Sequence, residues 1–190
     1  MDKMEDIVDY GPLEALIGTW EGDKGMDIAP ESDGTEEHNP YYEVIEIIEG
    51  GDLENANVQT LSMVSYHQLV TRKSDGKVFH DEVGYWIWDA DRKTVIRSFT
   101  IPRAVAIVAG GSYTDSTDGK VVLEVSAAVN NHDWDIAQSP FMKEKAKTTA
   151  FESRFEVDGD TLNYFQNTSL EIYGRSFDHT DENVLTRVSK

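Results

Sequence analysis

The 190-residue sequence contains no cysteine, few basic residues and no long apolar run. The absence of cysteine excludes disulfide bonds, thiolate metal sites and a cysteine nucleophile. No apolar stretch approaches the roughly 18 residues that predict a membrane-spanning helix. Residues 1–12 also lack the basic start and apolar centre of a signal peptide. These absences predict a soluble, cytoplasmic protein without membrane insertion.

Basic residues are outnumbered, because 17 Lys and Arg accompany 36 Asp and Glu and give a formal net charge of −19. A surface this negative repels phosphate backbones and anionic lipid surfaces, so we expect no nucleic-acid partner. We interpret the acidic residues of the N-terminal third as a solvated face. The segment "ESDGTEEH" at residues 31–38 does not have the spacing of a calcium-binding loop.

The hydrophobic pattern is almost entirely that of β-strands joined by short polar turns. There is little room for crossover helices, so the sheet should be antiparallel. Short helical segments are expected at residues 12–17 and within the connection 133–147, which Pro140 interrupts. Besides a first strand around Trp20, we expect strands at residues 41–49, 57–71, 78–89, 94–101, 104–109, 121–129, 148–157, 162–172 and 182–188.

About ten sequential antiparallel strands leave exposed edges unless the sheet closes. Closure into an up-and-down β-barrel removes the edges and leaves a cavity for one small ligand. We therefore predict an all-β barrel with a short N-terminal helix, and a β-sandwich is the alternative. The expected organisation is an acidic tail over residues 1–11 and a single barrel domain over residues 12–190.

Three segments, in order along the chain, resemble one family. They are "PLEALIGTWEGDKG" at residues 12–25, "FHDEVGYW" at 79–86 and "AKTTAFESRFEVDGDTLNY" at 146–164. They are similar to the opening, the mid-chain His-x-Glu-x-Gly segment and the late hairpin of the nitrobindins, which are intracellular haem-binding barrels related to lipocalins and fatty-acid-binding proteins. The resemblance implies a barrel that binds a small hydrophobic ligand. If that ligand is haem, it also implies nitric oxide and peroxynitrite chemistry.

Gly18, Trp20 and Arg187 match the closed end of such barrels. In lipocalins and their relatives, a Gly-x-Trp on the first strand packs at the narrow end. A basic side chain from near the last strand lies across the indole. The resemblance therefore implies that Trp20 plugs the barrel and that Arg187 stacks on it, in a cation–π contact worth about 0.5–2 kcal/mol.

His179 is the candidate axial ligand of haem, and a metal ligand only through the haem iron. Nitrobindins hold iron with one histidine on the last strand, a few residues before a motif that residues 185–187 match. Gapless alignment on this motif places Thr180 at the ligand position and His179 one residue early. Such a shift turns a strand side chain to the opposite face. The acidic segment 178–183 is typical of a turn, and there His179 would be exposed.

His80 and Glu82 lie two residues apart on one expected strand, so they share a face with Trp86. Inside the barrel they would form a hydrogen-bonded pair, whereas an outward polar stripe is the alternative. Trp86 is expected either to pack in the barrel wall or to contact the ligand. Tyr66 is a further candidate for contact with the cavity, since Tyr66 and His67 point to opposite faces.

Two functions are compatible with these features. The first is a binding module for a small hydrophobic ligand, with haem as the cofactor that the resemblance implies. The second is a metal-free enzyme of isomerase or hydrolase type, in which His80 and Glu82 supply a general base. Arg97 and Arg154 lie within apolar strands and either clamp a carboxylate inside the barrel or lie on its surface. The sequence leaves the ligand, the presence of enzyme activity and a homodimer open.

Overall fold

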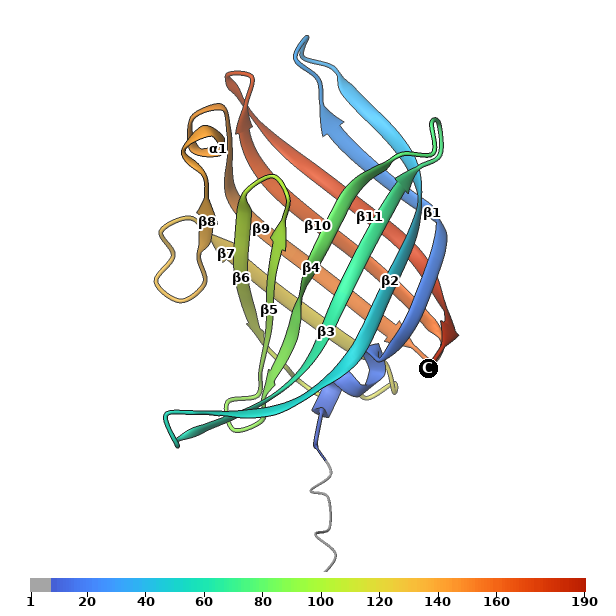
Figure 1. The fold of residues 1–190 in the computed structure, drawn as a ribbon, viewed down its shortest axis with the longest axis vertical. Coiled ribbons are helices and arrows are strands. Elements are labelled where there is room, and N and C mark those ends of the chain that lie inside the picture. Colours follow the sequence, from blue (N-terminus) through green and yellow to red (C-terminus); the bar gives the residue numbers. More distant parts are fainter. Residues whose placement is uncertain (1–7) are drawn as a thin grey trace, which may run out of the picture.

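A computed structural model describes residues 8–190 as a closed antiparallel β-barrel with short helical pieces (Figure 1). This confirms the predicted ten-stranded up-and-down barrel. The elements in chain order are η1 (Gly11–Leu16, a 3₁₀-helix), β1 (Gly18–Pro30), β2 (Glu36–Asn55), β3 (Gln59–Arg72), β4 (Val78–Asp89), β5 (Thr94–Ile101), β6 (Val105–Ser112), β7 (Val121–Ala128), β8 (Ile136–Gln138), α1 (Pro140–Lys145), β9 (Ala146–Asp158), β10 (Thr161–Ile172) and β11 (Arg175–Ser189).

The predicted acidic tail over residues 1–11 falls mostly outside the described residues. Its division from one barrel domain over residues 12–190 therefore stays a prediction. Within residues 8–190, no helix has the length and apolar character needed to cross a membrane.

Closure of the sheet is complete around the ring β1–β2–β3–β4–β5–β6–β7–β9–β10–β11. Strand β5 pairs with β6, and β11 returns to pair with β1. All these pairings are antiparallel, as expected for strands joined by local turns. One continuous ring excludes the β-sandwich alternative. Strand β8 stands beside the ring and, among residues 8–190, forms its strand pairing with residues 105–107 of β6.

Two strands run further than the hydrophobic pattern predicted. Strand β2 occupies Glu36–Asn55 and β11 occupies Arg175–Ser189, where we expected residues 41–49 and 182–188. The prediction of a turn at residues 178–183 is wrong, because this acidic segment lies in β11 and pairs with β10. Here polar side chains occupy both faces of the strand, so the alternation that marks a strand in sequence is absent.

Helix η1 covers one end of the barrel beneath Trp20, which is completely buried. The indole Nε1 donates a hydrogen bond to the Leu16 carbonyl over 2.7 Å. The Arg187 guanidinium carbon lies 4.0 Å from the centroid of the Trp20 ring, and the same guanidinium donates to the carbonyl of Ile17. The sequence motif thus lies where the resemblance placed it, with the indole inside and the arginine across it.

Gly18 precedes Trp20 at a position where a side chain has no room. Its φ of +129° is disfavoured for residues with a Cβ. A Cβ here would lie only 2.4 Å from the Ser189 carbonyl oxygen on the neighbouring strand. Glycine therefore allows the first strand to start tightly against the last.

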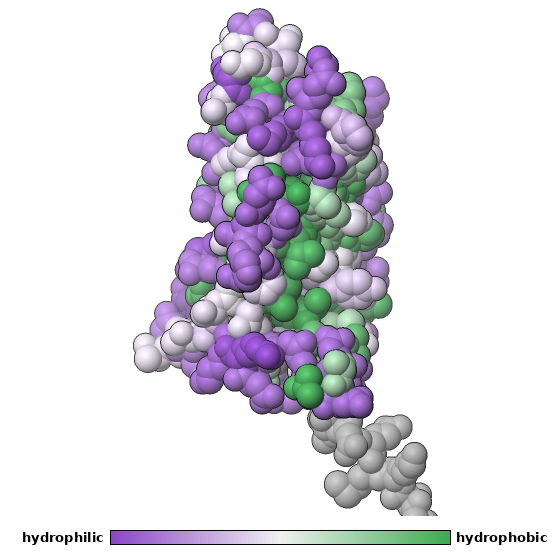
Figure 2. All heavy atoms as spheres, turned by 90° about the vertical axis from the view of Figure 1, so that its left-hand side faces the viewer, coloured by the Kyte–Doolittle hydropathy of each residue, from purple (hydrophilic) through white to green (hydrophobic). Residues whose placement is uncertain are grey.

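One seam of the barrel is weak, because β6 and β7 are joined by the single pair Gly110 and Ser126. The insert between β7 and β9 covers this region. A Cβ on Gly110 would lie 2.3 Å from the Trp134 ring, so that indole rests directly on the β6 backbone. Figure 2 views this side of the barrel and shows apolar side chains running between hydrophilic ones. The insert therefore adds a short strand that pairs with β6 and one indole that covers β6 at the seam.

Candidate functional site

A cavity of about 290 Å³ opens at the end of the barrel opposite η1. This volume lies at the small end of ligand pockets, which run from about 300 to 1,000 Å³. One wall is apolar and includes Phe99, Ile107 and Phe151 from β5, β6 and β9. The other carries the polar side chains Asp27, Asn39, His80, Glu82, Gln166, His179 and Asp181. A bound molecule would therefore meet hydrocarbon on one side and charge on the other.

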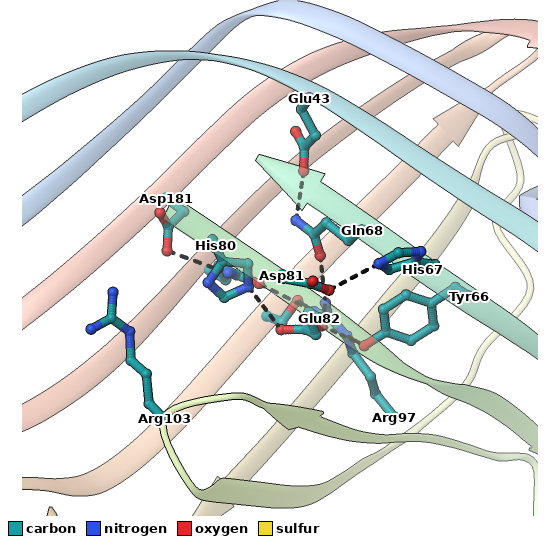
Figure 3. A network of polar contacts seen from close by, with 12 residues as sticks. Glu43, Tyr66, His67, Gln68, His80, Asp81, Glu82, Arg97, Arg103 and Asp181 are labelled. Atoms are coloured by element: carbon teal, nitrogen blue, oxygen red, sulfur yellow. Dashed lines mark hydrogen bonds and ion pairs between the residues drawn. The ribbon is translucent and has the colours of Figure 1, made fainter. Parts of the chain in front are cut away.

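Below the cavity, Arg97 of β5 is the centre of a buried polar network (Figure 3). Its side chain is fully buried, and Nη2 donates to Glu82 Oε1 over 2.7 Å. Nε donates to the Tyr66 hydroxyl over 2.9 Å. The guanidinium also donates to Gln68, Ser153 and Gln166. Arg97 thus uses its donors on the protein itself and is not free to clamp a ligand carboxylate.

His80 sits between this network and the cavity. Its Nε2 lies 3.3 Å from Glu82 Oε2, and Figure 3 shows its ring facing Asp181. Burial lowers the pKa of His80, but the hydrogen bond and charge of Glu82 outweigh burial, so the pKa is raised overall. Burial raises the pKa of Glu82, but the Arg97 charge reverses this, and that pKa is lowered. The pair therefore favours imidazolium beside carboxylate, which suits a proton donor better than a general base.

A second buried carboxyl group is joined to the network through Gln68. Gln68 Nε2 donates to Glu43 Oε1 over 2.5 Å, and Asn183 Nδ2 donates to Glu43 Oε2 over 2.7 Å. The Tyr164 hydroxyl lies 3.0 Å from both carboxylate oxygens. Burial is the dominant influence on Glu43 and raises its pKa to about 7 despite these donors.

A third polar group lies on the cavity wall where β1 meets β11. His179 Nε2 is 2.5 Å from Asp27 Oδ1, and Asn39 donates to the other Asp27 oxygen over 2.9 Å. Asp181 is on the same face of β11 and accepts from Gln166 over 3.3 Å. Burial lowers the pKa of His179, but the bond to Asp27 outweighs it, so the pKa is raised overall. Burial raises the pKa of Asp181 to about 6, because it outweighs the opposing charge of His179, and the Asp27 charge adds to the rise.

The predicted site residues fall into two groups. His80, Glu82 and His179 all line the cavity. His80 and Glu82 therefore do not form an outward polar stripe, and His179 is not an exposed residue in a turn. His179 faces inward because it lies an even number of residues before the buried Leu185 on a continuous strand.

Tyr66 and Trp86 face the barrel interior but are not among the described residues that line the cavity. The Tyr66 hydroxyl donates a hydrogen bond to Glu82 and accepts one from Arg97. Both its donor and an acceptor site are therefore occupied within the network. Trp86 packs edge-on against Phe155 in the core. Their place is below the cavity floor, so the expected contact with a cofactor has no geometric support.

Two arginines lie at the cavity mouth. Arg72 stacks on Phe79 with 4.9 Å between the guanidinium carbon and the ring centroid. Its buried Nε has no hydrogen-bond partner among the described residues. Arg103 also lines the mouth. A ligand that carries a carboxylate would satisfy the free Arg72 donor. Arg154, the other arginine within an apolar strand, lies outside and pairs with Glu156.

Sequence reasoning missed Asp27 and Asp181, which form the polar wall with His179. The available signal was the spacing of two between His179 and Asp181, which puts both on one face of a strand. Asp27 could not be linked to them, because its pairing opposite Asp181 depends on the closing register of β1 and β11.

These features define a closed antiparallel β-barrel with a cavity that is open at one end. Residues 9–187 match the family described as "THAP4-like, heme-binding beta-barrel domain". The chain therefore belongs to this family, which is the nitrobindin family that the sequence motifs resembled.

The fold is also similar to the crystal structure of Rv2717c from M. tuberculosis, with a TM-score of 0.65 and 22% sequence identity. That match covers 95% of this chain and 99% of the other. At this identity the likeness concerns the fold. No curated protein matches the sequence.

Proposed function

We propose that the barrel binds haem in its open cavity, with His179 as the axial ligand. The observation that carries this proposal is the inward position of His179 on the last strand of a barrel from a haem-binding family. Asp27 lies behind the imidazole, and metal-bound histidines commonly donate their other ring N–H to a carboxylate. That arrangement leaves one ring nitrogen for iron.

The other cavity residues fit a haem group in two ways. Phe99, Ile107 and Phe151 supply an apolar wall for a flat macrocycle. The unpartnered Nε of Arg72 at the mouth would meet a propionate carboxylate. Because the cavity volume is about 290 Å³, a ligand as large as haem would extend through the mouth.

If bound, haem would supply the iron for the nitric oxide and peroxynitrite chemistry that the family resemblance implies. The chain's own contributions are the axial imidazole, an apolar wall that limits water, and His80. The raised pKa of His80 lets it hold a proton at Nε2 or Nδ1 and donate it to a polar ligand in the cavity.

Haemin titration tests this proposal. The full chain should show a saturable red shift of the Soret band with one haemin per chain, and His179→Ala should abolish it or weaken binding at least tenfold. His67→Ala is the matched control, since His67 is exposed and hydrogen-bonds to Asp81 outside the cavity. An unchanged shift in His179→Ala, or no shift in the unaltered chain, would overturn the haem assignment.

The chemistry requires a separate measurement. Peroxynitrite decay followed by stopped-flow absorbance should be faster with the haem-loaded chain than with the haem-free chain. His80→Gln should slow this decay without abolishing the Soret shift. If decay is equal with and without haem, the barrel binds haem without supporting this reaction.

A second candidate function, a metal-free isomerase or hydrolase at His80 and Glu82, has one observation in its favour. The pair lies on the cavity wall and is oriented by Arg97. Its electrostatics favour His80 as an acid rather than the base we first expected. Turnover of an apolar substrate by the haem-free chain, lost in His80→Gln, would support this candidate.

A further inference from the structure

Three potential metal ligands meet on the cavity wall. Asp27 comes from β1, and His179 and Asp181 come from β11, where Asp27 and Asp181 are register partners. One donor atom from each side chain lies within 4.8 Å of the other two. Side chains from two adjacent strands thus converge on one point, and the cavity provides the path by which an ion would reach it.

Neighbouring amides hold the two carboxylates in place. Asn39 Nδ2 donates to Asp27 Oδ2 over 2.9 Å, and Gln166 Nε2 donates to Asp181 Oδ2 over 3.3 Å. Such outer hydrogen bonds orient the ligands of metal sites. Each amide uses one carboxylate oxygen, and the second oxygen of Asp27, Oδ1, lies 2.5 Å from His179 Nε2, a contact that a bound ion would replace.

The electrostatics of this wall favour a cation. Two carboxylates share a confined space with one imidazole, and Asp27 is only 3% exposed. Arg97 is already paired with Glu82, and Arg103, which lines the cavity, is the arginine whose charge acts on His179. Two carboxylates carry more negative charge than a single imidazole can compensate. A bound divalent ion would supply that compensation.

We propose that Asp27, His179 and Asp181 bind a first-row divalent transition-metal ion, with Zn²⁺ as the representative. One imidazole nitrogen and two carboxylate oxygens form a mixed donor set that suits Zn²⁺ and related ions better than Ca²⁺, which takes six to eight oxygens. Three protein ligands leave a coordination position facing the cavity. This site goes beyond haem binding, and the metal ion and haem would compete for His179.

Calorimetric titration of the full chain with Zn²⁺ tests the site. The unaltered chain should bind one ion in a saturable, high-affinity step. Loss of an outer hydrogen bond already costs a metal site about 10–100-fold in affinity. Asp181→Asn, which removes a ligand, should therefore weaken this step at least about 100-fold. The substitution preserves shape and removes a buried charge, so it should fold. Circular dichroism and thermal unfolding would verify this.

A matched control distinguishes Zn²⁺ binding in the cavity from Zn²⁺ binding at the protein surface. His132 lies 2.8 Å from Asp133 in the same kind of His–Asp contact, but its side chain is 99% exposed. His132→Ala should leave the high-affinity step unchanged. Equal Zn²⁺ binding by the unaltered chain and Asp181→Asn, or the absence of a saturable step, would overturn the metal site.

The haem proposal is distinguished by titrating the same variants with haemin. Asp181→Asn should keep the Soret shift while losing Zn²⁺, whereas His179→Ala should lose both. Zn²⁺ at saturation should weaken haemin binding to the unaltered chain. Zn²⁺ binding that depends on Asp181 in a chain without a Soret shift would sink the haem proposal and support the metal site.

Discussion

Arg97 and Glu82 form an ion pair in the middle of the barrel, with 2.7 Å between Nη2 and Oε1. Their side chains are 0% and 1% exposed, so water cannot screen either charge. The desolvation of both groups is costly, and the network around them, including the Tyr66 hydroxyl, satisfies their remaining hydrogen-bonding capacity. The pair lies directly below the cavity and contacts His80 through Glu82.

Arg97→Met should therefore strongly destabilise the fold. The substitution leaves Glu82 buried without its cation, and loss of one partner of a buried pair costs about 3–5 kcal/mol. The free energy of unfolding from urea titration would measure this loss. The double variant Arg97→Met with Glu82→Gln should recover part of it, because the unpaired charge is then gone.

Arg154→Met is the matched control for this loss. Arg154 also lies within a strand and pairs with Glu156 over 2.7 Å, but its side chain is 45% exposed. Exposed pairs contribute about 0–1 kcal/mol, so little change is expected. Comparable losses in Arg97→Met and Arg154→Met would show that burial of the inner pair is not the source of the effect.

The contact between Arg187 and Trp20 should stabilise the closed end of the barrel. Arg187→Met removes the cation over the indole and the hydrogen bonds to the carbonyls of Ile17 and Ala15. We expect a loss of about 1–3 kcal/mol in unfolding free energy, from the cation–π term and the unsatisfied carbonyls. Arg187→Lys keeps a cation but not the planar fork, so an intermediate loss is expected. If both variants match the unaltered protein, the stack contributes nothing measurable.

The buried carboxyl of Glu43 should lower the free energy of unfolding as pH rises toward neutrality. Its pKa of about 7 in the fold exceeds the usual 4.5 because the carboxyl is buried. A carboxyl with a raised folded pKa stabilises the fold fully below its unfolded pKa, and this contribution is lost as pH rises through 7. A shift of this size corresponds to about 3 kcal/mol. Glu43→Gln should therefore gain stability relative to the unaltered chain between pH 5 and pH 8.

Urea titrations at the two pH values would test this, with Glu46→Gln as the control. Glu46 lies on the same strand, but its side chain is exposed on the outer face. The difference between Glu46→Gln and the unaltered chain should not change with pH. A pH-independent difference for Glu43→Gln as well would mean that Glu43 is ionised in the fold across this range.

The closed barrel could be predicted because its evidence is local. Short turns between strands require antiparallel neighbours. The contact between Trp20 and Arg187, which are distant in sequence, was expected only from the family resemblance. The position of His179 could not be predicted, because its facing depends on whether residues 178–183 form a turn or a strand. That choice is decided by pairing with β1 and β10, which are distant in sequence.

The buried polar network around Arg97 and Glu43 could not be predicted from the sequence either. On β2, Glu43 points inward whereas Tyr42 and Val44 are 53% and 41% exposed, which inverts the usual apolar-in pattern. Arg97 and Arg154 show the same ambiguity, since each sits in an apolar strand and only one is inside. Buried networks of this kind are stable only when every partner is present, and here the partners come from seven strands, β2 to β5 and β9 to β11.

The indole of Trp134 should hold the seam between β6 and β7. These strands share the single pair Gly110 and Ser126, so few backbone hydrogen bonds resist local opening there. Trp134→Ala removes the ring that covers Gly110, and amide hydrogen exchange in β6 and β7 should accelerate at least tenfold. Amides of β10, which pairs along its whole length with β9 and β11, should keep their protection.

Phe141→Ala separates this effect from a general disturbance of the insert. Phe141 lies in α1 of the same insert but is 67% exposed, so its removal should leave exchange at the seam unchanged. Gly110→Ala disrupts the same contact from the β6 strand, because the added methyl group would displace the Trp134 indole. It should accelerate the same amides as Trp134→Ala. Equal exchange in all three variants and the unaltered chain would mean that the single strand pair suffices and that the insert only covers the surface.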